Sequence, residues 1–397
     1  MILQQEPPVH LTYCMNIHPG EFWVDQLAAI QEKAAVLRQM IRPDEWFGLG
    51  LRLGAQAVAD LGAEPELRRA MLDVFAENQL YPFTVNAFPY GRFHAGPVKE
   101  NVYAPDWRTP ERREYTFDVC DILSEWLPDG VDGSISTVPG SFKQWIHDRS
   151  SVSLIANNLA AVVAYLAAVH EDTGKEIHLG LEPEPACMLE TTEETVRFFK
   201  EVMWTEGVEE LKRIRKCYTK DAEAMMRRHL GVCLDTCHVA LQFEEPVDAL
   251  KTYLAEGIRV SKIQLSSALV AHNTPEARAA LAPFAEPVYL HQVKGRDQDG
   301  KVHSWVDLPL ALSELESRPD IDELRVHFHV PLFFTDAGPL TSTSGTLCPA
   351  FFREIHRKAT SHLEIETYTF DVLPESVHPG DLVRSISREY MWVMEHF

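Results

Sequence analysis

The chain has 397 residues, of which 59 are acidic and 37 basic, so its formal charge at neutral pH is -22. This excess of negative charge argues against a main task of binding nucleic-acid backbones or anionic membranes, and it is compatible with binding a cation. The seven cysteines are odd in number and lack a paired metal-knuckle spacing, which indicates a reduced, cytoplasmic compartment rather than a disulfide framework.

In the first half of the chain, strand patterns alternate with helical ones. Strands are predicted at residues 9–17, 46–53, 81–88, 133–138 and 176–182, with helical periodicity between them. Residues 1–10 show neither the basic nor the apolar region of a targeting peptide. The most apolar helix, at 151–170, is predicted to be buried, because its apolar run is too short to span a membrane. The sequence therefore predicts a protein without membrane insertion.

The second half continues the alternation. Further strands are predicted at 229–235, 258–269, 324–330 and 362–367, and residues 286–307 are expected to form a hairpin insertion. Alternating strands and helices predict an α/β fold with a parallel sheet, here one domain over residues 1–397. A closed (β/α)₈ TIM barrel needs eight strands, whereas nine are predicted. We therefore expect one of them, 46–53 or 325–331, to lie outside the ring.

Side chains that can bind a metal stand at five of the predicted strand ends. They are Glu182 or Glu184, Asp235 with His238, Gln264, His327 or His329, and Glu364 or Glu366. Because the carboxyl ends of barrel strands meet at one face, these side chains are expected to form a ring. Carboxylates with one imidazole suit Mn²⁺ or Mg²⁺, and additional histidines favour Zn²⁺ or Co²⁺. Members of each pair two residues apart share a face of the strand, so strand periodicity does not separate them.

Position along the strand favours His329 and Glu366, which lie nearer the carboxyl tips. A second group of residues is predicted to bind substrate, because its members stand at early strand ends, in the long loop 89–99, or on the same face as Gln264. They are His18, Asn86, Arg92, His94, Lys99 and Lys262. The alternative for Arg92 and Lys99 is a solvated surface position, and for Lys262 a buried ion pair.

Three motifs resemble those of a known superfamily. The segments 180–183 (Gly-Leu-Glu-Pro), 231–238 (Gly-Val-Cys-Leu-Asp-Thr-Cys-His) and 364–367 (Glu-Ile-Glu-Thr) are similar to the strand ends of xylose-isomerase-like TIM barrels. That superfamily includes sugar epimerases, sugar-phosphate isomerases and endonuclease IV. Segments 11–21, 86–91 and 362–370 further resemble the EboE family of metabolite-traffic proteins. That resemblance spans nearly the whole chain and implies a cytoplasmic barrel that handles a small metabolite beside a prenyltransferase-like membrane protein.

The resemblance also implies roles for single residues. It selects Glu182 over Glu184, and it makes Glu182, Asp235 and Glu366 metal ligands, with Glu182 and Glu366 exchanging protons with substrate and His238 orienting it. The superfamily places a histidine on the seventh strand, where this chain has Gln264. Either Gln264 ligates through its amide oxygen, or His329 completes the set.

The sequence thus leads to a hypothesis with one alternative. The hypothesis is a metal-dependent isomerase or epimerase acting on a small polyhydroxylated molecule. The alternative is a metabolite-binding or carrier protein with a degenerate metal site. An abasic-site endonuclease is disfavoured, because its polyanionic substrate would meet a net charge of -22.

Overall fold

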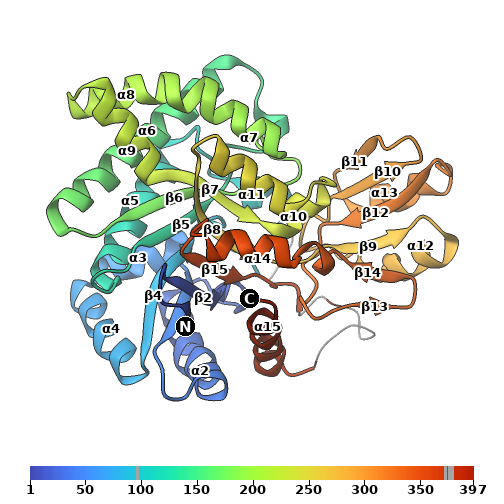
Figure 1. Ribbon diagram of the computed structural model, residues 1–397, viewed down its shortest axis with the longest axis horizontal. Helices are drawn as coiled ribbons and strands as arrows, with labels where there is room; N and C mark the ends of the chain where they lie inside the picture. Colours follow the sequence, from blue (N-terminus) through green and yellow to red (C-terminus); the bar gives the residue numbers. More distant parts are fainter. Residues whose placement is uncertain (95–97, 371–372, 374–379) are drawn as a thin grey trace.

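Eight parallel strands form a nearly closed barrel, and a second sheet lies beside it (Figure 1). The structure is a computed structural model that describes residues 1–94, 98–370, 373 and 380–397. The barrel strands are β2 (Val9–Tyr13), β3 (Phe47–Arg52), β4 (Leu80–Asn86), β5 (Gly133–Thr137), β6 (Ile177–Leu181), β7 (Leu230–Asp235), β8 (Arg259–Leu265) and β15 (His362–Ile365). Their order around the ring is β2-β15-β8-β7-β6-β5-β4-β3, and a parallel bridge between Cys14 and Gly50 joins its two ends. A short strand, β1 (Ile2–Gln4), pairs antiparallel with β2.

Helices surround this barrel on the outside, as expected for a TIM barrel (Figure 1). Those that lie between barrel strands or close the chain are α1 (Trp23–Ala29), α2 (Ala35–Ile41), α3 (Ala55–Ala63), α4 (Pro65–Glu77), α5 (Pro110–Trp126), α6 (Arg149–Thr173), α7 (Thr192–Phe198), α8 (Val208–Arg215), α9 (Thr219–His229), α10 (Thr236–Leu241), α11 (Pro246–Ala255), α14 (Pro349–His356) and α15 (Leu382–His396). Short 3₁₀ or π segments are η1 (Met15–Ile17), η2 (Ile30–Ala34), η3 (Lys99–Tyr103), η4 (Lys143–Trp145), η5 (Phe199–Gly207), η6 (Ala282–Phe284) and η7 (Ser344–Thr346). The predicted strand 9–17 is therefore shorter, because the chain turns into η1 at Met15.

The apolar helix α6 is longer than its sequence pattern predicts. Its 25 residues make it the one helix in the described residues that is long and apolar enough to cross a membrane, so the prediction that its apolar run is too short was wrong. More than half of its most apolar window, 56%, is buried inside the protein. It packs against α5, α8 and α9. Its apolar face is therefore used in the layer around the barrel.

The second sheet is inserted between β8 and β15 and is antiparallel throughout. Its order is β11-β10-β12-β9-β14-β13. Its elements are β9 (Leu269–His272), α12 (Pro275–Leu281), β10 (Val293–Asp297), β11 (Val302–Trp305), α13 (Leu308–Leu315), β12 (Ile321–Val326), β13 (Asp336–Ala337) and β14 (Leu340–Ser342). We call residues 269–342 the insertion. In Figure 1 it forms the orange part beside the barrel.

The insertion resolves the surplus strand. The pattern at 46–53 is β3 of the barrel, whereas that at 324–330 gives β12, which pairs with β9 and β10 outside the ring. The predicted strand 258–269 is two elements, because the chain leaves the barrel after Leu265 and Leu269 begins β9. The strands β10 and β11 pair as a hairpin from Val293–Trp305 to Arg296–Val302 within this larger sheet.

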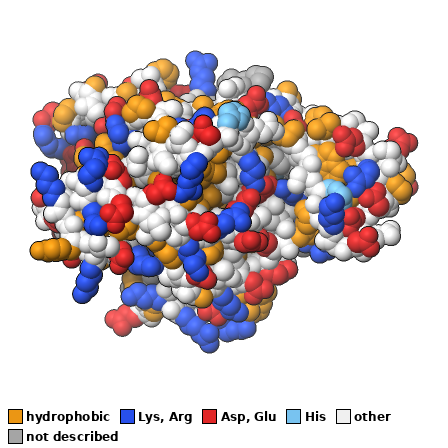
Figure 2. All heavy atoms as spheres, turned by 90° about the horizontal axis from the view of Figure 1, so that it is seen from above, with side chains coloured by type: hydrophobic (Ala, Val, Ile, Leu, Met, Phe, Trp, Pro, Cys, Tyr) orange, Lys and Arg blue, Asp and Glu red, His pale blue; other side chains and the backbone are white. Residues whose placement is uncertain are grey.

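Close packing holds the amino ends of β7 and β8 together. A Cβ atom on Gly231 would lie 2.2 Å from the carbonyl oxygen of Arg259, so only glycine allows β7 to approach β8 so closely. On the outside, acidic and basic side chains are interspersed over the face shown in Figure 2. The chemistry of the protein is therefore sought at the strand ends and not on this face.

Candidate metal centre and pocket

Three carboxylates converge at the carboxyl ends of the barrel strands. Glu182 follows β6, Asp235 ends β7 and Glu366 follows β15, and none is more than 4% exposed. One oxygen of each lies within 4.8 Å of the others. Asp235 also caps α10, because its Oδ1 accepts hydrogen bonds from the backbone N–H of His238 (3.0 Å) and from Ser266 Oγ (2.6 Å). Asp235 therefore both caps α10 and belongs to the carboxylate cluster.

In each of the three carboxylates, one buried oxygen has no hydrogen-bond donor among the described residues. These atoms are Glu182 Oε2, Asp235 Oδ2 and Glu366 Oε2. The other oxygen of Glu366, Oε1, accepts from Nδ2 of Asn16 (2.7 Å) and of Asn86 (3.1 Å). A buried carboxylate oxygen without a partner is costly, and a bound cation removes that cost. The donor set therefore fits a divalent metal ion.

The three carboxylates of this cluster repel one another when they are ionised. Burial, followed by repulsion from Asp235, raises the pKa of Glu182 well above its usual range. Burial and Glu182 raise the pKa of Glu366 in the same direction. Burial opposes ionisation of Asp235 too, yet His238, His329 and the Ser266 hydrogen bond together lower its pKa. Without a cation the cluster therefore retains protons, which a bound metal would displace.

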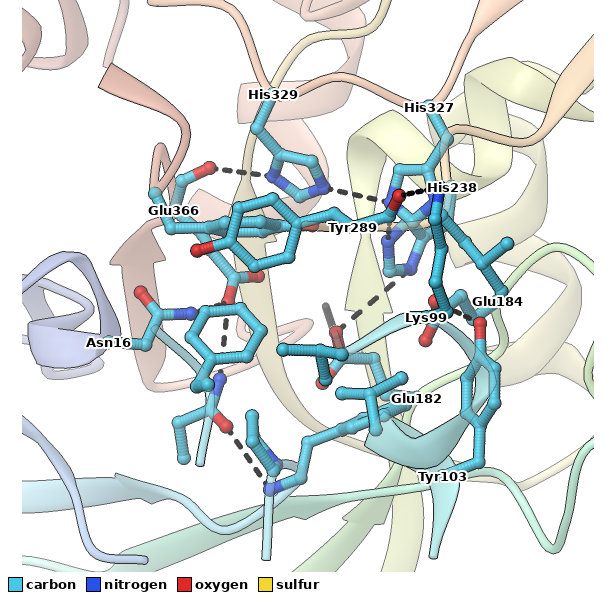
Figure 3. Close-up of a pocket in the computed structure, with 18 residues that line it drawn as sticks. Asn16, Lys99, Tyr103, Glu182, Glu184, His238, Tyr289, His327, His329 and Glu366 are labelled. Carbon is cyan, nitrogen blue, oxygen red and sulfur yellow. Dashed lines mark hydrogen bonds and ion pairs between the residues drawn. The ribbon is translucent and has the colours of Figure 1, made fainter. Parts of the chain in front are cut away.

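Three buried histidines adjoin the carboxylates (Figure 3). His238 lies on α10, and His327 and His329 follow β12, so that two of the three come from the insertion. The Nε2 atoms of His238 and His327 lie 3.0 Å apart, and those of His327 and His329 lie 3.2 Å apart. Burial lowers the pKa of His238 to about 4 and that of His327 well below its usual value. Burial also lowers the pKa of His329, so all three are mainly neutral imidazoles near pH 7, the form that binds metals.

A fourth buried acid, Glu184, lines the same cavity and belongs to a chain of hydrogen bonds. Glu184 Oε1 accepts from the Tyr103 hydroxyl (2.9 Å), which in turn accepts from Gln292 Nε2 (3.0 Å). Gln292 Oε1 accepts from His327 Nδ1 at 2.6 Å. Burial raises the pKa of Glu184 to about 8. Glu184 is therefore a largely protonated acid at neutral pH, linked to the histidine cluster.

The cavity at these strand ends is small, and contacts between the long loop and the insertion cross its rim. It has a volume of about 60 Å³ and is lined by Asn16, Asn86, Phe88, Pro89, Phe93, Val98, Lys99, Val102, Tyr103, Glu182, Glu184, His238, Tyr289, Leu290, His327, His329, Glu366 and Tyr368. At the rim, the backbone N–H groups of Val98 and Lys99 donate to the carbonyl of Val288. Lys99 Nζ also donates to the Tyr289 carbonyl (2.8 Å) and to Asp307 Oδ2 (2.6 Å). The insertion thus covers the barrel mouth.

The residues predicted to bind substrate divide into two groups. Asn86 and Lys99 line the cavity. His94 and Arg92 line a separate surface hollow, and His94 bonds the Asn16 carbonyl (2.6 Å) and the Tyr289 hydroxyl (2.9 Å). His18 is buried against the Tyr13 hydroxyl at 2.8 Å and does not line the cavity. Residues 95–97 of the long loop 89–99 lie outside the described residues.

Lys262 forms the buried ion pair that the sequence analysis gave as the alternative to substrate binding. It is fully buried inside the barrel, 2.5 Å from Glu364 Oε2 and 3.2 Å from Thr84 Oγ1. Burial opposes its charge, but Glu364 raises the pKa of Lys262 above the usual value. Glu364 is thus paired with Lys262, whereas Glu366 belongs to the carboxylate cluster. Lys262 therefore has a structural position, and the alternative given for it in the sequence is the one observed.

Gln264 takes an orientation that the sequence does not reveal. Its Oε1 accepts a hydrogen bond from Cys233 Sγ at 2.9 Å, and its Nε2 has no partner among the described residues. The amide oxygen is thus engaged with a thiol. Residues that the sequence analysis did not select include Asn16, Tyr103, Gln292 and Ser266. Of these four residues, only Asn16 could have been selected from the sequence, because it is polar and follows the first strand.

No family model matches the sequence, and no curated protein matches it. Solved structures do match. A structure described as the probable 3-DHS dehydratase AsbF of petrobactin synthesis from Bacillus anthracis has 10% identity and a TM-score of 0.50, covering 97% of this chain and 98% of that chain. A D-tagatose 3-epimerase-like protein has 11% identity and a TM-score of 0.47, with 98% of both chains covered.

A third similar structure is the IolI protein with a bound zinc atom. It has 13% identity and a TM-score of 0.44, and the match covers 98% of this chain and 99% of that chain. Identities this low show the fold alone. The similarity to the AsbF structure therefore supports only the TIM-barrel fold described above.

Proposed function

We propose that this protein is a metal-dependent enzyme of isomerase or epimerase type that acts on a small polyhydroxylated, sugar-like metabolite. The observation that carries the proposal is the convergence of three buried carboxylates, each with one oxygen that lacks a donor. Glu182, Asp235 and Glu366 would hold the ion, for which Mn, Zn, Co and Mg are candidates. When bound, the ion would polarise a carbonyl or hydroxyl oxygen of the substrate.

The protein's own groups supply the proton transfers. Glu182 and Glu366 line one cavity from different strands. Either carboxylate can take a proton from the substrate carbon that it faces and, as the carboxylic acid so formed, return that proton to the adjacent carbon. Asn16 and Asn86 hold Glu366 in position through its Oε1. His238 is fixed by the Pro183 carbonyl (3.1 Å) and lies 4.0 Å from Glu182 Oε1, where it orients substrate.

Binding of a sugar-sized substrate requires the rim to open. A volume of about 60 Å³ holds a few water molecules, whereas pockets for small molecules have volumes of roughly 300 Å³ or more. The contacts of Lys99 and Val98 with residues 288–289 and Asp307 are therefore expected to break when substrate enters.

Hydrogen exchange into substrate tests this function directly. Metal-loaded protein is incubated in D₂O with a panel of ketoses, aldoses and their phosphates, and proton NMR follows deuterium at the carbons next to the carbonyl. We expect exchange on at least one compound, and its loss in Glu366→Gln. Glu77→Gln, on the exposed face of α4, is the matched control. Metal-loaded protein that exchanges no compound of the panel contradicts the enzymatic proposal.

A carrier protein is the second candidate. It is favoured by Gln264, whose amide oxygen faces Cys233 and so leaves β8 without a free oxygen ligand. A carrier would bind metal and one of the panel compounds in calorimetry without deuterium exchange. The same experiment thus separates the two candidates.

For the cellular setting we propose a metabolite-traffic role in the cytoplasm, beside a prenyltransferase-like membrane protein. The EboE-like motifs at 11–21, 86–91 and 362–370 support this proposal. Co-purification of the two proteins from cells that express both tests it.

A further inference from the structure

The cavity contains very little positive charge from lysine and arginine. Within the part of the chain that the structure describes, Lys99 is the one lysine or arginine that lines it. Residues 95–97, 371–372 and 374–379, which lie outside that part, contain neither lysine nor arginine in the sequence. The charge of Lys99 is already balanced, because its Nζ donates to Asp307 Oδ2 at 2.6 Å. The cavity therefore offers an anionic group no lysine or arginine that lacks a carboxylate partner.

The insertion holds Asp307 beside Lys99. Asp307 Oδ1 accepts hydrogen bonds from the backbone N–H of His291 (3.0 Å) and from that of Leu308 (3.0 Å), the latter as the N-cap of α13. These two bonds do not involve Lys99, so they can persist when the rim opens. An anion that approaches Lys99 then also meets the carboxylate of Asp307. The pair consequently adds no net positive charge to the mouth of the cavity, whether the rim is closed or open.

The floor of the cavity is acidic. Glu182, Glu184 and Glu366 line it, and Asp235 belongs to the same carboxylate cluster. A bound divalent ion balances only two of the three charges of its carboxylate ligands. The adjoining histidines are mainly neutral, so they do not compensate for the remaining charge. An anionic group on a substrate would therefore be repelled by the floor, and repulsion is strong in a buried site.

The rim of the cavity is largely apolar. Phe93 of the long loop, Tyr289 of the insertion and Tyr368 after β15 pack together, with ring centroids 5.2 Å (Phe93–Tyr289), 5.2 Å (Phe93–Tyr368) and 5.7 Å (Tyr289–Tyr368) apart. The apolar residues that complete the lining are Phe88, Pro89, Val98, Val102 and Leu290. Burying an ionised group against such side chains without a partner is costly, whereas an uncharged ring can pack on them.

We propose that the substrate is an uncharged polyhydroxylated carbonyl compound, without a phosphate or carboxylate group, and that Asp307 of the insertion determines this specificity. The inference rests on the proposed function, for which it names the substrate class. Asp307 cancels the one cation of the lining, the floor repels anions, and the rim accepts an uncharged end of the molecule. The insertion thus both covers the cavity and selects the charge of what enters it.

Paired ligands test this specificity in the full, metal-loaded chain. Each ketose and aldose of the exchange panel is compared with its own terminal phosphate monoester, by titration calorimetry and by deuterium exchange. We expect the dissociation constant of the phosphate to exceed that of its parent by at least ~100-fold. A phosphate that binds as tightly as its parent, or a protein that binds no parent compound, would overturn the proposal. So would a preference for the phosphate that disappears in Lys99→Met, because Lys99 would then bind an anionic group of the substrate.

Asp307→Asn separates the role of this residue from the charge of the whole protein. The asparagine oxygen can still accept from His291 and Leu308, but the charge of Lys99 is no longer balanced. The ratio of the two dissociation constants should therefore fall by ~10-fold or more. Asp299→Asn, which removes the same charge from an exposed turn of the insertion, should keep the wild-type ratio. An unchanged ratio in Asp307→Asn, or an equal fall in Asp299→Asn, would overturn the role of Asp307.

The salt dependence of the wild type keeps the test independent of folding defects in the variants. Raising the ionic strength from about 0.05 M to about 0.5 M screens charge repulsion and should lower the ratio by at least ~3-fold. A ratio that does not depend on salt would overturn the electrostatic explanation.

Failure of this proposal is distinguishable from failure of the proposed function. Deuterium exchange on a phosphate with none on its parent leaves the enzymatic proposal intact and overturns the substrate class. Selective binding of uncharged parents without deuterium exchange supports the substrate class and favours the carrier.

Discussion

The buried ion pair inside the barrel allows a quantitative prediction. Lys262 and Glu364 are both fully buried, and Lys262 Nζ lies 2.5 Å from Glu364 Oε2. Lys262→Met would leave the Glu364 carboxylate without its cation, while Glu364 Oε1 already has no hydrogen-bond donor within the part of the chain that the structure describes. Removing one partner of such a pair costs about 3–5 kcal/mol, mostly from the uncompensated charge that remains.

This cost translates into a measurable change of melting temperature. With an unfolding entropy of about 2.1 cal/mol/K per residue, the 397 residues give roughly 0.8 kcal/mol/K. The melting temperature of Lys262→Met should therefore fall by about 4–6 °C. The double variant Lys262→Met/Glu364→Gln removes both charges and should recover more than half of this loss.

Differential scanning calorimetry of metal-free protein checks the prediction, with Lys220→Met on the exposed end of α9 as the matched control. The pKa of Lys262 is raised by Glu364. Because Lys262 stays charged below that raised pKa, scans at pH 7 compare the variants with a wild type whose ion pair is intact. A fall below 1 °C, or a double variant as unstable as the single one, would refute the ion-pair reasoning. If Lys262→Met is as stable as the wild type but no longer binds substrate, Lys262 would instead be a substrate-binding residue.

Three further predictions concern pH, metal and the rim. Burial raises the pKa of Glu389 to about 7, so the folded state binds its proton more tightly than the unfolded state. The contribution of this group to stability should therefore fall as the pH rises from 4.5 to 7. In urea titrations the difference in stability between wild type and Glu389→Gln should change by roughly 3 kcal/mol over this range, and a constant difference would contradict the assignment. Chelation should lower the melting temperature, since a ligand at 1,000 times its Kd adds about 4 kcal/mol of stability; an unshifted melting curve with metal removed argues against a bound ion. Lys99→Met removes the contacts with Asp307 and the Tyr289 carbonyl. It should lower the free energy of unfolding by less than about 1 kcal/mol, yet increase the rate at which a chelator removes the metal. An unchanged rate would show that the rim does not limit access to the metal.

The barrel fold and the edge that carries the candidate site could be predicted from the amino-acid sequence. Strand and helix periodicities are local, and parallel strands joined by helices place their carboxyl ends on one face. For that reason Glu182, Asp235 and Glu366 could be selected from sequence position together with the motif resemblance, and the structure brings their oxygens within 4.8 Å of one another. Asp235 with His238 was recognisable because a strand end and the first turn of the following helix are adjacent in sequence.

The tertiary structure decided what depends on contacts between distant segments. Whether residues 46–53 or 325–331 belong to the ring depends on which strand each one pairs with, and pairing is not local. The pair Glu364 and Glu366 shares a face of the strand, so only packing could assign Glu364 to Lys262 in the barrel interior.

The histidine cluster shows the same limit. His327 and His329 could be selected from the sequence. Gln292, whose Oε1 accepts a hydrogen bond from His327 Nδ1, lies 35 residues from His327 in the chain and carries no local signal. Local periodicity specifies which residues stand at strand ends. The folded insertion decides which of their atoms face one another, because that depends on side-chain contacts between segments the sequence keeps apart.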